Sequence, residues 1–111
     1  MVTISFAGNK NRNILFQTKV GGNIRQGFDA NTIAAKIVNE MHGWQFNTEG
    51  KERVYAELMY LTDDELKTVY NLYNRKYSEG KTLTSLLDGE YAVNSAFKKD
   101  VVSRLRALNL P

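Results

Sequence analysis

From residue 29 onward, apolar residues recur at helical spacing, and helix-capping signals interrupt them at short intervals. The clearest signal is Thr62-Asp63-Asp64-Glu65, in which Thr62 caps a helix and Glu65 reaches back as the partner of a capping box. Asp63 and Asp64 strengthen the same start, because acidic side chains are favoured at the positive end of the helix dipole. A chain punctuated in this way is predicted to form several short helices.

Five helices are expected, each bounded by a polar cap or a glycine. In order, they are a helix capped by Asp29 or Asn31 and ended by Gly43, one capped by Asn47 or Thr48, one from Thr62 to about Tyr77, one from Thr82 to near Gly89, and one that starts at Asn94 or Ser95. The last is expected to turn Phe97, Val101, Leu105 and Leu108 inward.

The first 28 residues show a different period. Val2, Ile4 and Phe6 alternate with polar residues, and a second alternating run covers residues 14–20. Residues 7–13 (AGNKNRN) lie between the runs and resemble a polar turn. We therefore expect a mainly α fold in which a β-hairpin or arm over residues 1–28 precedes a helical bundle over residues 29–111.

The length and composition of the chain bound its class. It has 111 residues, 42% of them apolar, which is enough for one domain and too little for two. It has no cysteine, so disulfides, thiol nucleophiles and thiolate metal sites are excluded. It shows neither a secretory signal nor an apolar run of membrane-spanning length. We expect a protein of the cytoplasm or of an assembled particle.

The positive charge is concentrated near the start of the chain. Residues 1–28 carry Lys10, Arg12, Lys19 and Arg25 and no acidic residue, whereas the remainder is nearly neutral. These four cations are candidates for contacts with a partner, including phosphate groups. They are dispersed, whereas nucleic-acid footprints cluster lysine and arginine, so solubility is the favoured interpretation and nucleic acid is not the expected partner.

The succession of five helices resembles a single annexin repeat over about residues 30–110. The motifs that carry the resemblance are Met41-His42-Gly43, Leu61-Thr62-Asp63-Asp64-Glu65-Leu66, the tyrosines Tyr70, Tyr73 and Tyr77, and Gly80-Lys81-Thr82-Leu83 with Leu86-Leu87. The resemblance implies an annexin-like five-helix bundle, with the hairpin outside it.

The resemblance also suggests where calcium would bind. Annexin repeats that bind calcium use a Gly-x-Gly-Thr loop and an acidic side chain about forty residues later. Gly43 and Thr48 match parts of that loop, and Asp88 or Glu90 matches the carboxylate. The loop here is longer and lacks the second glycine, so it is degenerate. No metal or cofactor is favoured, and calcium is kept as an alternative.

Other side chains that bear chemistry have simpler structural interpretations. His42 is the only imidazole and is expected to cap the end of the first helix. The tyrosine stripe is expected to belong to the core, with its hydroxyls reaching the surface. Trp44 and Phe46, in the loop after the first helix, are either a lid on the core or a contact patch. No catalytic arrangement is found, so an enzyme is not expected.

An isolated hairpin is marginally stable, and a lone annexin-like repeat must cover flanks that its neighbours would otherwise bury. These two features predict a non-enzymatic assembly module that binds a protein partner or copies of itself. The small size, the lack of cysteine and the many asparagines suggest a phage or viral particle as the setting. The alternative function, implied by the resemblance, is calcium-dependent binding to anionic membranes.

Overall fold

The computed structural model describes residues 15–42 and 47–111. In these two ranges the chain forms five α-helices and one π-helical turn. They are α1 (Ala30–Met41), α2 (Thr48–Met59), α3 (Asp63–Leu72), the π turn η1 (Tyr73–Tyr77), α4 (Leu83–Asp88) and α5 (Ala96–Ala107).

The helices begin at polar caps, as the sequence predicts. Asp29 rather than Asn31 caps α1, and its carboxylate accepts from the Asn31 and Thr32 amides. The capping box of α3 is present in full, since the Thr62 side chain accepts from Glu65 N–H and the Glu65 side chain accepts from Thr62 N–H. The remaining helices α2, α4 and α5 are capped by Asn47, Thr82 and Ser95. Local side-chain chemistry therefore fixes where each helix starts.

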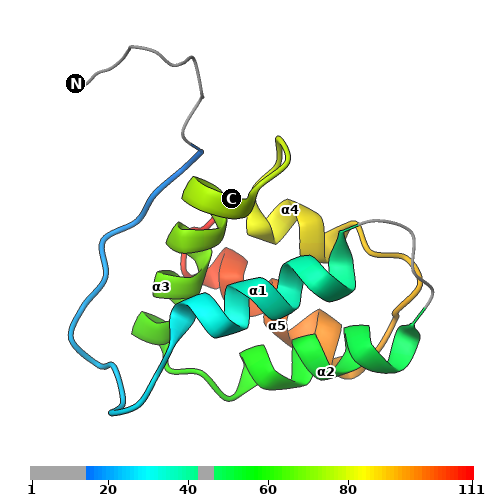
Figure 1. The fold of residues 1–111 in the computed structure, drawn as a ribbon, viewed down its shortest axis with the longest axis horizontal. Coiled ribbons are helices and arrows are strands. Elements are labelled where there is room, and N and C mark those ends of the chain that lie inside the picture. Colours follow the sequence, from blue (N-terminus) through cyan, green and yellow to red (C-terminus); the bar gives the residue numbers. More distant parts are fainter. Residues whose placement is uncertain (1–14, 43–46) are drawn as a thin grey trace.

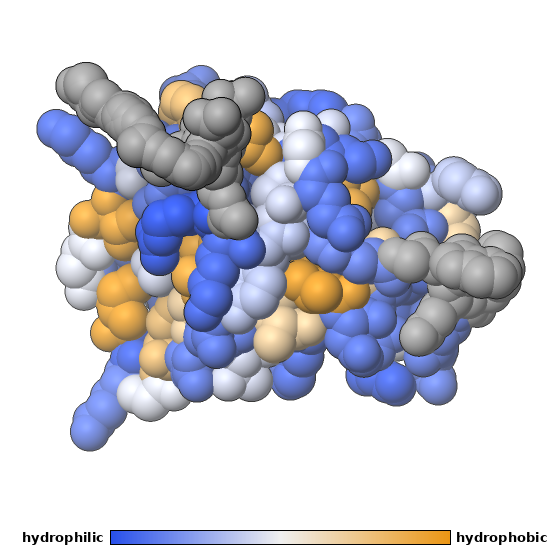
Figure 2. Space-filling view, turned by 45° about the horizontal axis from the view of Figure 1, so that its top comes forward, coloured by the Kyte–Doolittle hydropathy of each residue, from blue (hydrophilic) through white to orange (hydrophobic). Residues whose placement is uncertain are grey.

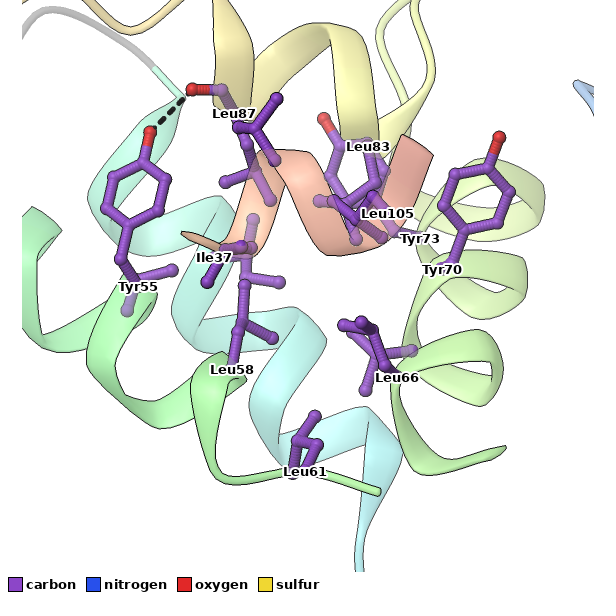
Figure 3. Packing of buried hydrophobic residues seen from close by; sticks show 14 of the residues in the cluster. Ile37, Tyr55, Leu58, Leu61, Leu66, Tyr70, Tyr73, Leu83, Leu87 and Leu105 are labelled. Atoms are coloured by element: carbon purple, nitrogen blue, oxygen red, sulfur yellow. Dashed lines mark hydrogen bonds between the residues drawn. The ribbon is translucent and has the colours of Figure 1, made fainter. Parts of the chain in front are cut away.

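The helices pack around one apolar core. Helix α1 lies against α2 and α3, and α5 lies between α2 and α4 (Figure 1). Figure 3 shows side chains from all five helices converging in this core, with the Tyr55 hydroxyl donating to the Leu87 carbonyl oxygen at 2.6 Å. The fully buried members include Ile37, Tyr55, Leu58, Leu66, Val69, Tyr70, Leu83, Leu87, Leu105 and Leu110.

The tyrosine stripe is part of this core, as expected. Tyr70 and Tyr73 are 0% and 1% exposed, and their hydroxyls reach hydrogen-bond partners at its edge. Tyr70 donates to the Pro111 carbonyl oxygen at 2.5 Å, and the partly buried Tyr77 donates to Asn31 Oδ1 at 2.6 Å. The helix predicted to end near Tyr77 does so, but its last five residues widen into η1, closed by Ser78 N–H on the Tyr73 carbonyl oxygen.

The predicted β-hairpin is wrong for the residues that the structure describes. Residues 15–28 contain no β-strand. Residues 15–25 form an extended segment whose backbone pairs with side chains of α3, its N-cap and η1. The described part of the alternating run, residues 15–20, is thus an extended chain that pairs with side chains instead of a strand. The first predicted strand (residues 2–6) and the turn (7–13) lie outside the described residues. Phe97 was also expected inside, but it is 39% exposed.

Candidate interaction surface on the N-terminal arm

Residues 15–25, called the arm below, run along the outside of α3 in the opposite direction to the helix (Figure 1). Phe16 lies opposite Asn74, Thr18 opposite Asn71, and Arg25 opposite Glu65. A turn at residues 26–27, with Gly27 at φ +84°, then reverses the chain into α1. The arm is thus an outer layer laid over the bundle.

The capping motif of α3 holds the end of the arm nearest α1. The Asp64 carboxylate accepts from Gly21 N–H and Asn23 N–H, both at 2.9 Å, and the Thr62 hydroxyl donates to the Asn23 carbonyl oxygen at 2.5 Å. The hydrogen bonds from Asn23 N–H and Gly21 N–H lower the pKa of Asp64 below its ordinary value. The motif therefore both starts the helix and binds the arm.

Glu65 provides the strongest contact with the arm. Its side chain is fully buried and forms an ion pair with Arg25, with 2.7 Å between Nη2 and Oε1. The Arg25 backbone N–H also donates to Oε2 at 2.8 Å. The hydrogen bonds from the Arg25 side chain are the main cause that lowers the pKa of Glu65 to about 2. Arg25 also donates to the Tyr60 carbonyl oxygen at 3.0 Å, which ties the arm to the end of α2.

Two asparagines hold the other end of the arm. Asn71 pairs with Thr18 as a neighbouring strand would, because its Oδ1 accepts from Thr18 N–H and its Nδ2 donates to the Thr18 carbonyl oxygen, both at 2.8 Å. Asn74 donates to the Phe16 carbonyl oxygen at 2.9 Å and accepts from Leu83 N–H, also at 2.9 Å. Thr62, Asp64, Glu65, Asn71 and Asn74 are called the clasp below.

The arm carries three large apolar side chains that are only partly buried. Phe16, Val20 and Ile24 stand four residues apart and are 47%, 39% and 40% exposed. Tyr60 is 74% exposed at the end of α2, beside Arg25. Apolar atoms gather along the left edge of Figure 2, the side on which Figure 1 places the arm and α3. Phe16 also packs edge-on against Tyr70, with 6.3 Å between the ring centroids. The arm thus binds through its polar backbone and this aromatic contact, and its large apolar side chains remain partly exposed.

The predicted cationic and aromatic contact residues fall in different places. Lys19 is exposed on the arm between the two ends of the clasp. Arg25 is engaged with Glu65, so it acts as an anchor of the arm. Lys10, Arg12, Trp44 and Phe46 lie outside the described residues.

The residues that the annexin resemblance implies for calcium do not meet at one point in the described part. Thr48 is exposed at the start of α2, and Gly43 lies outside the described residues. Asp88 pairs with Arg106 at 2.8 Å. Glu90 pairs with Lys51 at 2.8 Å and accepts from Ala92 N–H. Residues 15–42 and 47–111 contain no group of three or more His, Asp or Glu side chains that could hold a metal ion.

The pair between Lys51 and Glu90 is a buried polar centre between α2 and the loop that precedes α5. Lys51 is 3% exposed. Burial raises the pKa of Glu90, but the hydrogen bonds from Lys51 and Ala92 and the charge of Lys51 outweigh it, so the pKa lies below its ordinary value. Lys98 donates to the Glu90 and Val93 carbonyl oxygens and holds the same loop. The Glu90 carboxylate is therefore already paired with the buried ammonium group of Lys51.

His42 lies between two helices. Its backbone N–H donates to the Val38 carbonyl oxygen, while its ring contacts side chains of η1 and the loop after it. Nε2 is 2.6 Å from the Tyr73 hydroxyl, and Nδ1 is 3.4 Å from Glu79 Oε1. Burial, with a smaller contribution from Glu79, raises the pKa of Tyr73 to about 12. The buried phenol stays protonated at neutral pH, and the contact joins α1 to η1.

Sequence reasoning missed the two asparagines of the clasp and the buried Lys51. One signal for Asn74 was present, because it lies four residues after Tyr70 and therefore on the apolar side of its helix. A polar side chain there, 3% exposed, requires hydrogen-bond partners, and these are the arm and Leu83 N–H. Lys51 carries the same signal, because it lies four residues before Tyr55 on the apolar side of α2, whereas Asn71 carries none.

Comparisons with protein-family models, with curated proteins and with solved structures find no match for this chain. The annexin resemblance therefore stays a prediction. No helix in the described ranges is both long and apolar enough to cross a bilayer.

Proposed function

We propose that this chain is a non-enzymatic assembly module that makes protein–protein contacts through the apolar edge of its arm. One observation carries the proposal: the arm uses its polar backbone groups to bind the bundle and leaves Phe16, Val20 and Ile24 between 39% and 47% exposed. Together with Tyr60, at the adjoining end of α2, they are partly exposed apolar groups of the kind that contact surfaces use.

The pairing of the acidic candidates supports this function over the calcium-dependent alternative. Asp88 and Glu90 already have cationic partners at 2.8 Å, so calcium would have to displace Arg106 and the buried Lys51. The contact surface on the arm requires no such rearrangement.

The test is the solution mass by light scattering on a sizing column, measured once with calcium and once with chelator. We expect a mass above that of the 12.6 kDa chain in both conditions. Phe16→Ser, Val20→Ser and Ile24→Ser combined should reduce the mass to that of the monomer. The matched control is Tyr91→Ser with Phe97→Ser, which removes exposed apolar side chains away from the arm and should leave the mass unchanged.

Two results would count against the proposal. An assembly that persists in the arm variant would place the contact elsewhere. A monomer in chelator that changes mass only when calcium is added would favour the annexin-like alternative.

A further inference from the structure

The arm contributes little to the apolar core of its own bundle. The buried cluster is built from residues of the five helices, η1 and the segments between and after them, and residues 15–27 supply no member of it. Phe28, just after the turn, is the first residue to pack against the cluster. The described bundle therefore closes its core from residue 28 onward, and the arm is attached by hydrogen bonds, one ion pair and the edge-on contact of Phe16 with Tyr70.

The clasp nevertheless requires an occupant. Glu65 is a fully buried carboxylate whose four donors are Thr62 N–H, Arg25 N–H, Arg25 Nε and Arg25 Nη2. Three of these four belong to the arm. A carboxylate deprived of them while still covered would be costly, so an arm that leaves the clasp must be replaced.

A second copy of the chain offers the ideal replacement. Its arm brings the same backbone groups and the same arginine, so the hydrogen bonds and the ion pair that break within one copy form again between two. We propose that the arm is exchanged between two copies of this chain, so that residues 15–25 of each copy occupy the clasp of the other. This inference rests on the proposed assembly function and names its partner, and it adds the clasp side of the arm to the contact, with Ile24 as the part of the apolar edge nearest the second bundle.

The hinge restricts how the two copies would meet. Arg25 is the last residue held by the clasp and Phe28 is the first held by the core, so the crossing segment spans three residue steps, roughly 10 Å when extended. Gly27 at φ +84° lies in this segment, where a change of backbone conformation is easiest. The two bundles must therefore touch beside the N-terminus of α3.

Two of the exposed apolar side chains lie at this place. Tyr60, 74% exposed, and Ile24, 40% exposed, flank Arg25 at that end of the arm. In the exchanged dimer they would lie between the two bundles and become buried. The exposure of Tyr60 in the single chain and the shortness of the hinge thus point to the same contact.

Engineered disulfides test the exchange directly, because the chain has no cysteine of its own. A Cβ added at Gly21 would lie 3.1 Å from Asp64 Cγ, so cysteines at these two positions are within bonding range. Chains carrying only Gly21→Cys and chains carrying only Asp64→Cys, distinguished by a mass tag, are unfolded together, refolded and oxidised. We expect the covalent heterodimer to exceed both homodimers on a non-reducing gel. The control pairs Gly21→Cys with Ser103→Cys on α5, which should give no such excess.

The double variant Gly21→Cys/Asp64→Cys supplies the second half of the test. Exchange predicts a covalent species of twice the 12.6 kDa chain mass, whereas an arm bound to its own bundle predicts an internally closed monomer. A closed monomer, with no heterodimer in the mixing experiment, would overturn the exchange. If the unaltered chain still forms an oligomer by light scattering, only the exchange fails. If it is a monomer, the assembly function fails as well.

Discussion

Glu65 has two structural roles that the sequence presents as one. As a capping-box residue it needs only to reach the Thr62 amide, and an exposed side chain would be sufficient. Here it is fully buried because Arg25 and the arm cover it. A local capping signal is therefore also a tertiary anchor, and the arm depends on the charge of this carboxylate.

The charge of Glu65 makes the attachment of the arm sensitive to acid. Its pKa falls from an ordinary 4.5 to about 2 in the folded chain. A lowered folded pKa means that the stabilisation is complete above the unfolded pKa and is lost as the pH falls through the folded one. We expect Glu65→Gln to lower the urea midpoint at neutral pH, and the difference from the unaltered chain to shrink between pH 4.5 and about 2.

The control for this prediction is Glu49→Gln on the surface of α2, where the glutamate side chain is 82% exposed. It should change neither the midpoint at neutral pH nor its acid dependence. A Glu65→Gln midpoint that stays below that of the unaltered chain by the same margin at all pH values would show that packing, rather than charge, is what the substitution removes.

At the scale of the helix, α3 acts as a partner strand made of side chains. Asn71 offers Thr18 one donor and one acceptor, both 2.8 Å from the peptide groups of the arm. Each such bond contributes about 1 kcal/mol, so Asn71→Ala should weaken that end of the arm by about 1–2 kcal/mol. Trypsin cleavage after the exposed Lys19 should then accelerate roughly 5–30-fold.

The matched control is Asn39→Ala, which removes an exposed asparagine from α1 and should leave the cleavage rate unchanged. Equal rates for Asn71→Ala and the unaltered chain would mean that the arm is not held at Thr18. A rate increase at many sites at once would instead indicate unfolding of the bundle.

The two acidic residues that the annexin resemblance implies for calcium, Asp88 and Glu90, differ in the burial of their ion pairs. Glu90 partners the buried Lys51, and removing one partner of a buried ion pair costs roughly 3–5 kcal/mol. Asp88 pairs with Arg106 on the surface, where a pair contributes about 0–1 kcal/mol. Glu90→Ala should therefore lower the free energy of unfolding far more than Asp88→Ala, with or without calcium, as measured by urea unfolding. Stabilisation by calcium that both substitutions abolish would contradict this.

The sequence predicts the helix caps correctly but not what holds the arm. Asp29, Thr62 and Ser95 act on amides two or three residues away, so their role is legible in the local sequence. The attachment of the arm cannot be predicted locally, because Thr18 N–H donates to the side chain of Asn71, 53 residues later in the sequence. The alternation was interpreted as a strand of a β-hairpin, which is wrong for the described residues, because period alone does not say whether the partner is a strand or a helix.

For the whole molecule, the division lies between a bundle that closes its own core and an arm that binds it from outside. The first core residue after the arm is Phe28, and the cap of α1 is Asp29, so both stay when residues 1–27 are removed. The truncated chain keeps the apolar cluster and loses the Arg25 partner of Glu65, which then becomes accessible to water.

We therefore expect deletion of residues 1–27 to leave a folded helical bundle that no longer assembles. Circular dichroism should retain the helical signal with a cooperative but lower melting temperature, because the clasp has no arm to bind while the core remains. Light scattering should give a monomer even at concentrations at which the full chain associates. A truncated chain that assembles as before would refute the arm as the contact element, and one that loses its helical signal would show that the bundle needs the arm to fold.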